Sequence, residues 1–325
     1  MAMFAIRFDM RNPDFSGVTM AERYAAALDM AEWADGLGGV MWGLSEHHAS
    51  ADGYLPSPLP MAAAAAARTK NIRIAINAIP APFHDPLRLA EDIAVVDHLA
   101  QGRLDIALVG GYVHEEFAMF DVPLNERPKR MTELVKTLKA AWTGEPFEYR
   151  GRTVRVTPTP FQAGGPNLML GGSSEGAARR AARIGDSFMP SEPHFWEHYR
   201  DECLKLGKPD PGPGYAGDTR VIHLATDVDR CWDEVGKYFL HETNAYGEWQ
   251  AAAGVEAGFH LVSDVETLRA EEQYRVLTPD QLAAELKAMG DFAFTMFHPM
   301  VGGIPPALAW ESLKLYEHEV LPQLG

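Results

Sequence analysis

Three ionisable residues in a row, Glu46, His47 and His48, are the best candidates for chemistry in this sequence. They end an apolar run that follows a Gly-Leu-Gly-Gly helix stop, so we expect residues 39–48 to form a buried strand with these side chains at its carboxyl end. A carboxylate and two imidazoles cost free energy to bury unless they are paired or hydrogen-bonded. Because an imidazole titrates near neutral pH, a histidine here is suited to moving a proton in a reaction. Mutual pairing of the three side chains, without any reaction, is the simpler alternative.

A second candidate is the turn Gly171, Gly172, Ser173 and Ser174, which lies between a short apolar run and a helical pattern. Free backbone amides, a helix dipole and two hydroxyls together form an anion site, and glycine lets a phosphate approach the backbone closely. An ordinary helix cap accounts for the same residues. Opposite a histidine pair in a barrel, the phosphate interpretation gains weight.

Metal binding by the histidine pair finds little support. Neighbouring strand residues point to opposite faces, so His47 and His48 cannot readily share one ion. The sequence also lacks His-x-His, His-Glu-x-x-His and Cys-x-x-Cys patterns. We therefore expect no metal ligands.

Composition limits the class of protein. The 325 residues carry a net charge of −16, and no basic patch stands out, which disfavours nucleic acid or an anionic membrane as a partner. The two cysteines are too few for a disulfide framework, and no apolar stretch is long enough for a signal peptide or a membrane span. We expect a cytoplasmic protein with reduced thiols.

Eight apolar strand patterns alternate with helical patterns along the chain. Such alternation indicates parallel strands joined by right-handed crossovers, and eight units most simply close into an α/β fold of the (β/α)8 TIM-barrel type. An open doubly wound sheet is the alternative, but its glycine-rich turn after the first strand is absent. We expect a single domain over residues 1–325, with a hairpin excursion near 144–160 and an insertion or lid near 242–277. The strands are expected at 3–10, 39–48, 71–79, 103–109, 167–170, 186–190, 220–225 and 292–297.

In a barrel the carboxyl ends of the strands share one mouth, so the residues that follow them converge. Besides the two candidates above, these positions hold Asn77, Gly110, Gly111, Tyr112, His114, Glu115, Ser191, Glu192 and His298.

Over nearly its full length the chain resembles the bacterial-luciferase-like, flavin-dependent monooxygenases. Each matching motif is loose, but their order is specific. The motifs are Trp42-Gly43-Leu44-Ser45-Glu46-His47-His48, His84-Asp85-Pro86-Leu87-Arg88, Leu99-Ala100-Gln101-Gly102-Arg103, Gly111-Tyr112-Val113-His114-Glu115-Glu116-Phe117 and Gly302-Gly303-Ile304-Pro305-Pro306.

The resemblance implies an insertion-bearing (β/α)8 barrel that forms a homodimer, or a heterodimer of similar chains. It implies reduced FMN from a separate flavin reductase, O2, and a small organic substrate attacked by a C4a-hydroperoxyflavin in a pocket poor in water. His47 corresponds to the family's catalytic histidine, flanked by Glu46 and His48. A deazaflavin coenzyme for hydride transfer, or a non-catalytic flavin-binding partner subunit, are the alternatives.

The resemblance also implies a cofactor site. Gly171, Gly172, Ser173 and Ser174 match the turn that holds the flavin phosphate. Asn77 and Ala78 stand where the family often has a cis peptide bond against the flavin ring, and Gly110, Gly111 and Tyr112 follow the fourth strand. Where luciferase has a phosphate-supporting arginine this chain has Gly110, and Ser173 replaces a glutamate. Another cation, such as Arg103 or a residue of a partner, is expected to compensate.

Overall fold

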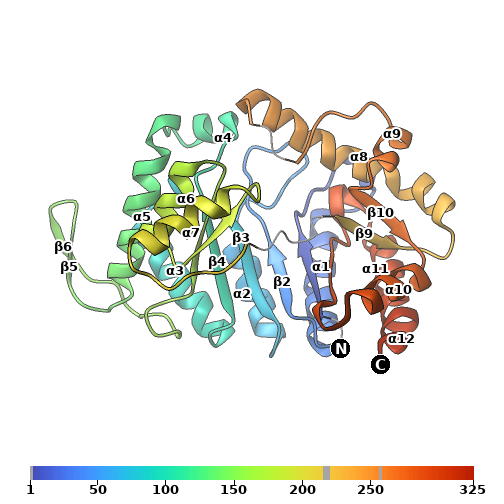
Figure 1. Ribbon diagram of the computed structural model, residues 1–325, viewed down its shortest axis with the longest axis horizontal. Coiled ribbons are helices and arrows are strands. Elements are labelled where there is room, and N and C mark those ends of the chain that lie inside the picture. The colour runs from blue at the N-terminus through green and yellow to red at the C-terminus, as the bar shows by residue number, and fades with distance from the viewer. Residues whose placement is uncertain (1–2, 215–219, 256–257) are drawn as a thin grey trace. The chain divides into compact units, whose positions relative to one another are not determined.

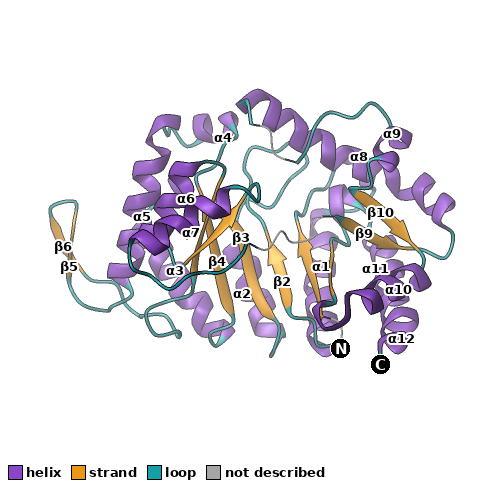
Figure 2. Cartoon of the chain, in the orientation of Figure 1, coloured by secondary structure: helices purple, strands orange, loops and turns teal. Residues whose placement is uncertain are grey.

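The computed structural model describes residues 3–214, 220–255 and 258–325, and these fall into two compact units (Figure 1). The first unit takes its described residues from 1–44, 50–56 and 217–325, and the second from 45–49 and 57–216. Each unit is built on parallel strands covered by helices (Figure 2).

The first unit contains five parallel strands in the order β10-β9-β11-β1-β2. Their bounds are β1 (Met3–Phe8), β2 (Met41–Leu44), β9 (Val221–Leu224), β10 (Tyr274–Leu277) and β11 (Phe294–Phe297). Its helices are α1 (Met20–Gly36), α8 (Val228–Ala253), α9 (Val265–Ala270), α10 (Pro279–Met289), α11 (Pro306–Leu315) and α12 (Leu321–Leu324).

Side chains alternate between the two faces of β1, and the large apolar ones share one face. Phe4, Ile6 and Phe8 are buried. The ring of Phe4 contacts Tyr316 and the ring of Phe8 contacts Trp42. Each such burial stabilises the fold by about 1.5–3 kcal/mol. Since successive strand residues point to opposite faces, Arg7 lies on the other side of the strand.

Helix α1 begins at a capping box, in which Thr19 and Glu22 satisfy each other's backbone amides. In its first turns Arg23 is fully buried and joins this helix to a loop near the end of the chain. The guanidinium donates to the backbone oxygens of Met300, Gly303 and Ile304 at 2.7–3.4 Å.

The second unit contains four parallel strands in the order β3-β4-β7-β8. They are β3 (Arg73–Pro80), β4 (Leu104–Val109), β7 (Leu168–Gly172) and β8 (Ser187–Pro190), and β5 (Phe147–Tyr149) and β6 (Arg152–Val154) form an antiparallel hairpin. Its helices are α2 (Pro58–Arg68), α3 (Pro86–Ala100), α4 (His114–Met119), α5 (Arg127–Ala141), α6 (Glu175–Ile184) and α7 (Phe195–Lys205). Alanines such as Ala62, Ala65 and Ala66 are buried in α2, where small side chains permit close packing.

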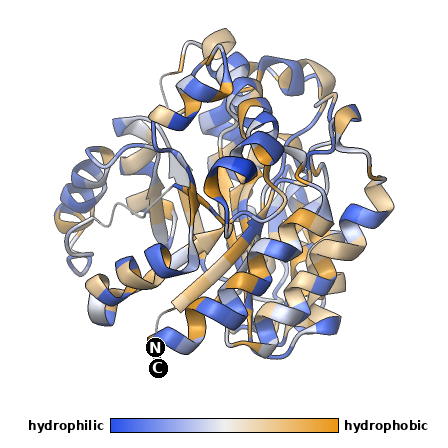
Figure 3. Cartoon of the chain, turned by 90° about the vertical axis from the view of Figure 1, so that its right-hand side faces the viewer, coloured by the Kyte–Doolittle hydropathy of each residue, from blue (hydrophilic) through white to orange (hydrophobic). Residues whose placement is uncertain are grey.

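Each of the eight expected strands is present, with bounds that differ by up to a few residues, and the hairpin lies where expected. The expectation of an insertion over 242–277 is wrong at both ends of that segment. Helix α8 continues to Ala253, and Tyr274–Leu277 form β10, a ninth parallel strand paired with β9. The helices carry hydrophilic and hydrophobic residues side by side (Figure 3), and none in the described residues is long and apolar enough to cross a membrane.

Candidate active site

Glu46 is the centre of a buried hydrogen-bonded cluster in the second unit. Only 3% of this residue is exposed, and its Oε1 accepts hydrogen bonds from Nε2 of His48 (3.0 Å) and Nε2 of His84 (2.7 Å). Burial alone would raise the pKa of Glu46, but these two hydrogen bonds outweigh burial and lower the pKa. Glu46 is therefore an ionised carboxylate, and it fixes a proton on Nε2 of both histidines.

His47 is held by a different carboxylate. Its Nδ1 lies 2.8 Å from Oε1 of Glu116 on α4, and the same oxygen accepts the backbone N–H of His48 at 2.8 Å. Glu116 is only 1% exposed. Since the carboxylate accepts the Nδ1 proton, the neutral imidazole carries its lone pair on Nε2, which is the arrangement of an oriented general base.

His48 is enclosed by aromatic rings instead. Its ring packs edge-on against Phe120 at 4.7 Å and Phe83 at 5.9 Å between centroids. With its Nε2 on Glu46 and its ring against these two phenylalanines, His48 fixes the shape of the loop. Of the two neighbouring histidines, His47 is the one placed for proton transfer.

The strand β3 carries the next feature. The peptide bond between Asn77 and Ala78 is cis, as the resemblance led us to expect. The backbone oxygen of Asn77 accepts a hydrogen bond from the Ser45 hydroxyl at 2.7 Å, which ties this peptide to the strand end that leads into Glu46.

The region after β4 supplies a cation that the sequence did not reveal. A Cβ added at Gly110 would lie 3.9 Å from Cβ of Arg127, the first residue of α5. The Arg127 guanidinium donates to the backbone oxygens of Gly111 (2.8 Å) and Leu124 (3.0 Å). The side chain of an arginine thus lies beside the glycine that replaces luciferase's arginine.

Arg103, the cation expected to compensate, is engaged elsewhere. It precedes β4, and its guanidinium donates to Thr69 and to the backbone oxygens of Ala66 and Ile72. These bonds hold the end of α2, and compensation by a partner's residue stays a prediction.

Packing, as well as ligand binding, accounts for the glycine and serine residues in the turn from β7 into α6. A Cβ at Gly172 would lie 2.4 Å from Cβ of Ala177, so glycine is needed there for helix and strand to meet. Ser173 and Ser174 are both exposed, and Ser174 caps α6 by accepting the N–H of Ala177 at 3.2 Å. Residues 172–176 also match Gly-x-Ser-x-Gly, but no histidine of the described chain is hydrogen-bonded to Ser174.

The structure thus brings Glu46, His47 and His48 together with two residues that were not chosen as site residues, His84 and Glu116. Both stand inside motifs that carry the family resemblance, so the signal was present in the sequence. Their neighbours His114 and Glu115 are exposed, and His298 belongs to a cluster in the first unit. The assignment of the remaining cofactor-binding residues stays a prediction.

The curated proteins with similar sequences include one uncharacterized protein and two that are named for flavin-dependent activities. An uncharacterized protein of Sinorhizobium fredii is 31% identical over 177 residues, 53% of this chain and 52% of that protein. The FMNH(2)-dependent dimethylsulfone monooxygenase of Pseudomonas putida is 30% identical over 128 residues, 37% and 35% of the two chains. The oxygenase component of the flavin-dependent trigonelline monooxygenase of Acinetobacter baylyi is 24% identical over 249 residues, 71% and 67%. The alignment thus spans about half the length of the first relative, and less of the second.

Solved structures share the fold over the whole chain. The monooxygenase RslO1 from Streptomyces bottropensis has a TM-score of 0.75 at 25% identity, covering 99% of this chain and 100% of that one. The oxygenating constituent of 3,6-diketocamphane monooxygenase from Pseudomonas putida, solved with FMN, has a TM-score of 0.70 at 19% identity, covering 100% of both. The sequence model of the luciferase-like monooxygenases matches residues 5–295. The chain therefore belongs to the luciferase-like monooxygenase family and has its (β/α)8 barrel fold.

Proposed function

We propose that this protein is a flavin-dependent monooxygenase of the cytoplasm that uses reduced FMN, delivered by a separate flavin reductase, and O2 to oxygenate a small organic substrate. The observation that carries the proposal is the pairing of His47 with the buried carboxylate of Glu116. Relatives named for FMNH2 dependence, and a neighbour solved with FMN, support the choice of cofactor. Reduced FMN, when bound, supplies the electrons that activate O2.

The residues of the second unit fit such a cofactor. The turn of Gly171 to Ser174 opens α6 and presents backbone amides and the exposed hydroxyl of Ser173 to an anion. Arg127 adds a positive charge beside Gly110, where a side chain would otherwise fill the space. We propose that these groups bind the phosphate of FMN and that the flavin ring lies against the cis peptide of Asn77 and Ala78.

His47 is proposed to act as the base. Its Nδ1–H stays hydrogen-bonded to Glu116 while Nε2 accepts a proton during oxygen transfer, and the negative charge of Glu116 stabilises the imidazolium that results. The stacked rings of Phe83 and Phe120, 4.9 Å apart, and the nearby Phe117 keep water from the inner side of this loop.

Two alternatives share the fold. An F420-dependent secondary alcohol dehydrogenase has a TM-score of 0.67 at 15% identity, which keeps hydride transfer with a deazaflavin as the second candidate. A non-catalytic flavin-binding subunit is the third, but such a chain has no need of an oriented base. A homodimer is proposed from the family resemblance alone.

The decisive variant is His47→Ala. We expect this variant to bind reduced FMN normally and to release hydrogen peroxide. Its product yield should fall on the order of a hundredfold or more, the usual size of a general-base contribution. Product and peroxide yields in a single turnover measure both effects, with circular dichroism to confirm the fold. His48→Ala is the matched control and should lose stability more than product. Near-normal product yield from His47→Ala would mean that its imidazole is structural.

A further inference from the structure

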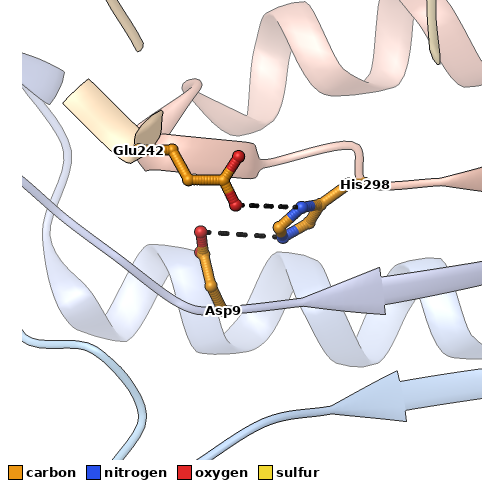
Figure 4. Close-up of side chains that lie close together, drawn as sticks. All are labelled: Asp9, Glu242 and His298. Atoms are coloured by element: carbon orange, nitrogen blue, oxygen red, sulfur yellow. Dashed lines mark ion pairs between the residues drawn. The ribbon is translucent and has the colours of Figure 1, made fainter. Parts of the chain in front are cut away.

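A second cluster of ionisable side chains lies in the first unit, away from any role described above. Asp9 follows β1, Glu242 is on α8, and His298 follows β11 (Figure 4). Their exposures are 2%, 1% and 4%, so all three side chains are removed from bulk water. Figure 4 shows one ring nitrogen of His298 facing each carboxylate.

The nitrogens of His298 have no hydrogen-bond partner in the described chain. Nε2 lies 3.6 Å from Oδ2 of Asp9, and Nδ1 lies 3.6 Å from Oε1 of Glu242. Both distances exceed the 2.7–3.2 Å of ordinary hydrogen bonds. Leaving buried polar atoms unsatisfied costs free energy, so these nitrogens call for a partner that the polypeptide does not supply.

The two carboxylates, in contrast, accept hydrogen bonds from other parts of the chain. Asp9 accepts the backbone N–H of Arg11 on Oδ1 at 2.9 Å and that of Gly302 at 3.1 Å on Oδ2, the oxygen that faces His298. Glu242 accepts the hydroxyl of Tyr274 on Oε2 at 2.7 Å, which leaves Oε1 turned toward His298. Outer hydrogen bonds that orient carboxylates in this way are typical of metal centres.

The separations fit ligands around one ion. With metal–nitrogen and metal–oxygen bonds of about 2.1 Å, two ligand atoms of a tetrahedral zinc lie about 3.4 Å apart. One ion can use only one nitrogen of His298, and the 3.6 Å from Nε2 to Oδ2 of Asp9 is close to that separation. One ligand atom from each of the three residues can be chosen so that all lie within 4.8 Å of one another.

We propose that Asp9, Glu242 and His298 form a site for one divalent transition-metal ion, of which Zn²⁺ fits best, with three protein ligands and an open fourth position. One imidazole and two carboxylates are a ligand set that zinc accepts. The sequence had given no reason to expect this site, because its ligands come from three distant segments and form no spacing motif.

Nearby arginines limit the strength of the site without filling it. The charges of Arg7 and Arg11 act on this cluster, and burial, with those charges, keeps the pKa of His298 well below its usual value. Arg11 pairs with Asp52, whose Oδ2 lies 2.5 Å from Nη1, and its Nε also lies 4.0 Å from Oδ2 of Asp9. We therefore expect weaker binding than at a zinc site made of thiolates.

The test titrates Zn²⁺ and Co²⁺ into the full-length protein after dialysis against EDTA, without flavin. We expect one equivalent of each ion to bind, with a rise in Tm and, for Co²⁺, the visible absorption of a low-symmetry site. His298→Gln should weaken binding at least tenfold, as should Glu242→Gln. His260→Gln, which changes a histidine exposed to 61% in the same unit, is the control and should leave binding unchanged.

The titration of the unmutated protein does not depend on how the variants fold. Absence of a Co²⁺ spectrum and of any Tm shift would overturn the proposal and leave water as the partner of His298. Equal affinity of the unmutated protein and a folded His298→Gln variant would overturn it too. Since no flavin is present, neither result bears on the proposed oxygenase activity.

Discussion

At the scale of single residues, Glu116 decides what His47 can do. Glu116→Gln keeps an oxygen near the Nδ1 proton but removes the negative charge that favours the imidazolium. We expect a lower turnover rate with little change in KM, and a half-maximal rate displaced to lower pH. The loss should be smaller than the hundredfold or more expected without the base itself.

The matched control for this variant is Glu115→Gln, which removes a neighbouring but exposed carboxylate. Its pH–rate profile should overlay that of the unmutated protein. If Glu116→Gln also overlaid it, the carboxylate would have no part in the reaction.

Asp52, in the first unit, gives a pH-dependent contribution to stability. Burial alone would raise its pKa, but the hydrogen bond from His241, the charge of Arg11 and the hydrogen bond from Ser50 outweigh burial and hold the pKa well below its usual value. Because the unfolded-state pKa, about 3.9, is the higher one, the stabilisation is complete above it and disappears as the pH falls through the folded-state value.

We therefore expect Asp52→Asn to lower the free energy of unfolding by about 3 kcal/mol at pH 7, the size typical of a broken buried ion pair. The difference from the unmutated protein should shrink below about pH 4. Urea unfolding at pH 7, 4 and 3 measures it. Asp229→Asn, at a position exposed to 85%, should change little at any pH, and a constant effect of Asp52→Asn down to pH 3 would contradict the assignment.

The residues that sequence reasoning found and missed differ in a physical way. His47 was recognisable because an ionisable group at the end of an apolar strand is unusual. Glu116 and His84 gain their roles only from tertiary contacts, at separations of 69 and 38 residues from their partners. Nothing in local spacing distinguishes Glu116 from Glu115, because only the helix orientation decides which of them is buried.

At the scale of elements, the start of α5 brings a cation to the proposed phosphate site. Arg127→Met should weaken FMN binding by about tenfold or more, as expected for a lost charge-assisted hydrogen bond, and leave riboflavin binding unchanged. Arg130→Met is the control on the same helix, because Arg130 pairs with Glu126 at 2.9 Å. Isothermal titration with both flavins checks the prediction. If Arg127→Met weakened the binding of FMN and of riboflavin equally, Arg127 would not contact the phosphate.

Element boundaries were predictable where periodicity was strong and failed where it was weak. The capping box of Thr19 and Glu22 marks the start of α1 in both sequence and structure. The strand β10, by contrast, has only four residues and follows a helix and loops without a clear apolar pattern. Its place in the sheet comes from pairing with β9, a long-range contact that single-sequence patterns do not contain.

At the scale of the whole molecule, the preferred cofactor should raise the thermal stability of the folded protein. A ligand that binds only the folded protein stabilises it by about 2.7 kcal/mol at a hundred times its Kd. We expect anaerobic, reduced FMN to raise Tm with concentration, reduced riboflavin to do so less, and a reduced deazaflavin not at all. Inorganic phosphate at matching concentration is the control. A rise with the deazaflavin and none with FMN would favour the hydride-transfer alternative.

Arg23 also sets the order in which the newly made chain can fold. It leaves the ribosome early, whereas the carbonyls that it binds belong to residues 300–304. A guanidinium is costly to bury without partners, so we expect α1 to reach its final packing only after residues 300–304 have been made. The second unit, drawn from 45–49 and 57–216, does not have to wait for these residues. Folding during synthesis therefore starts in the middle of the chain, and its first helix is among the last elements to settle.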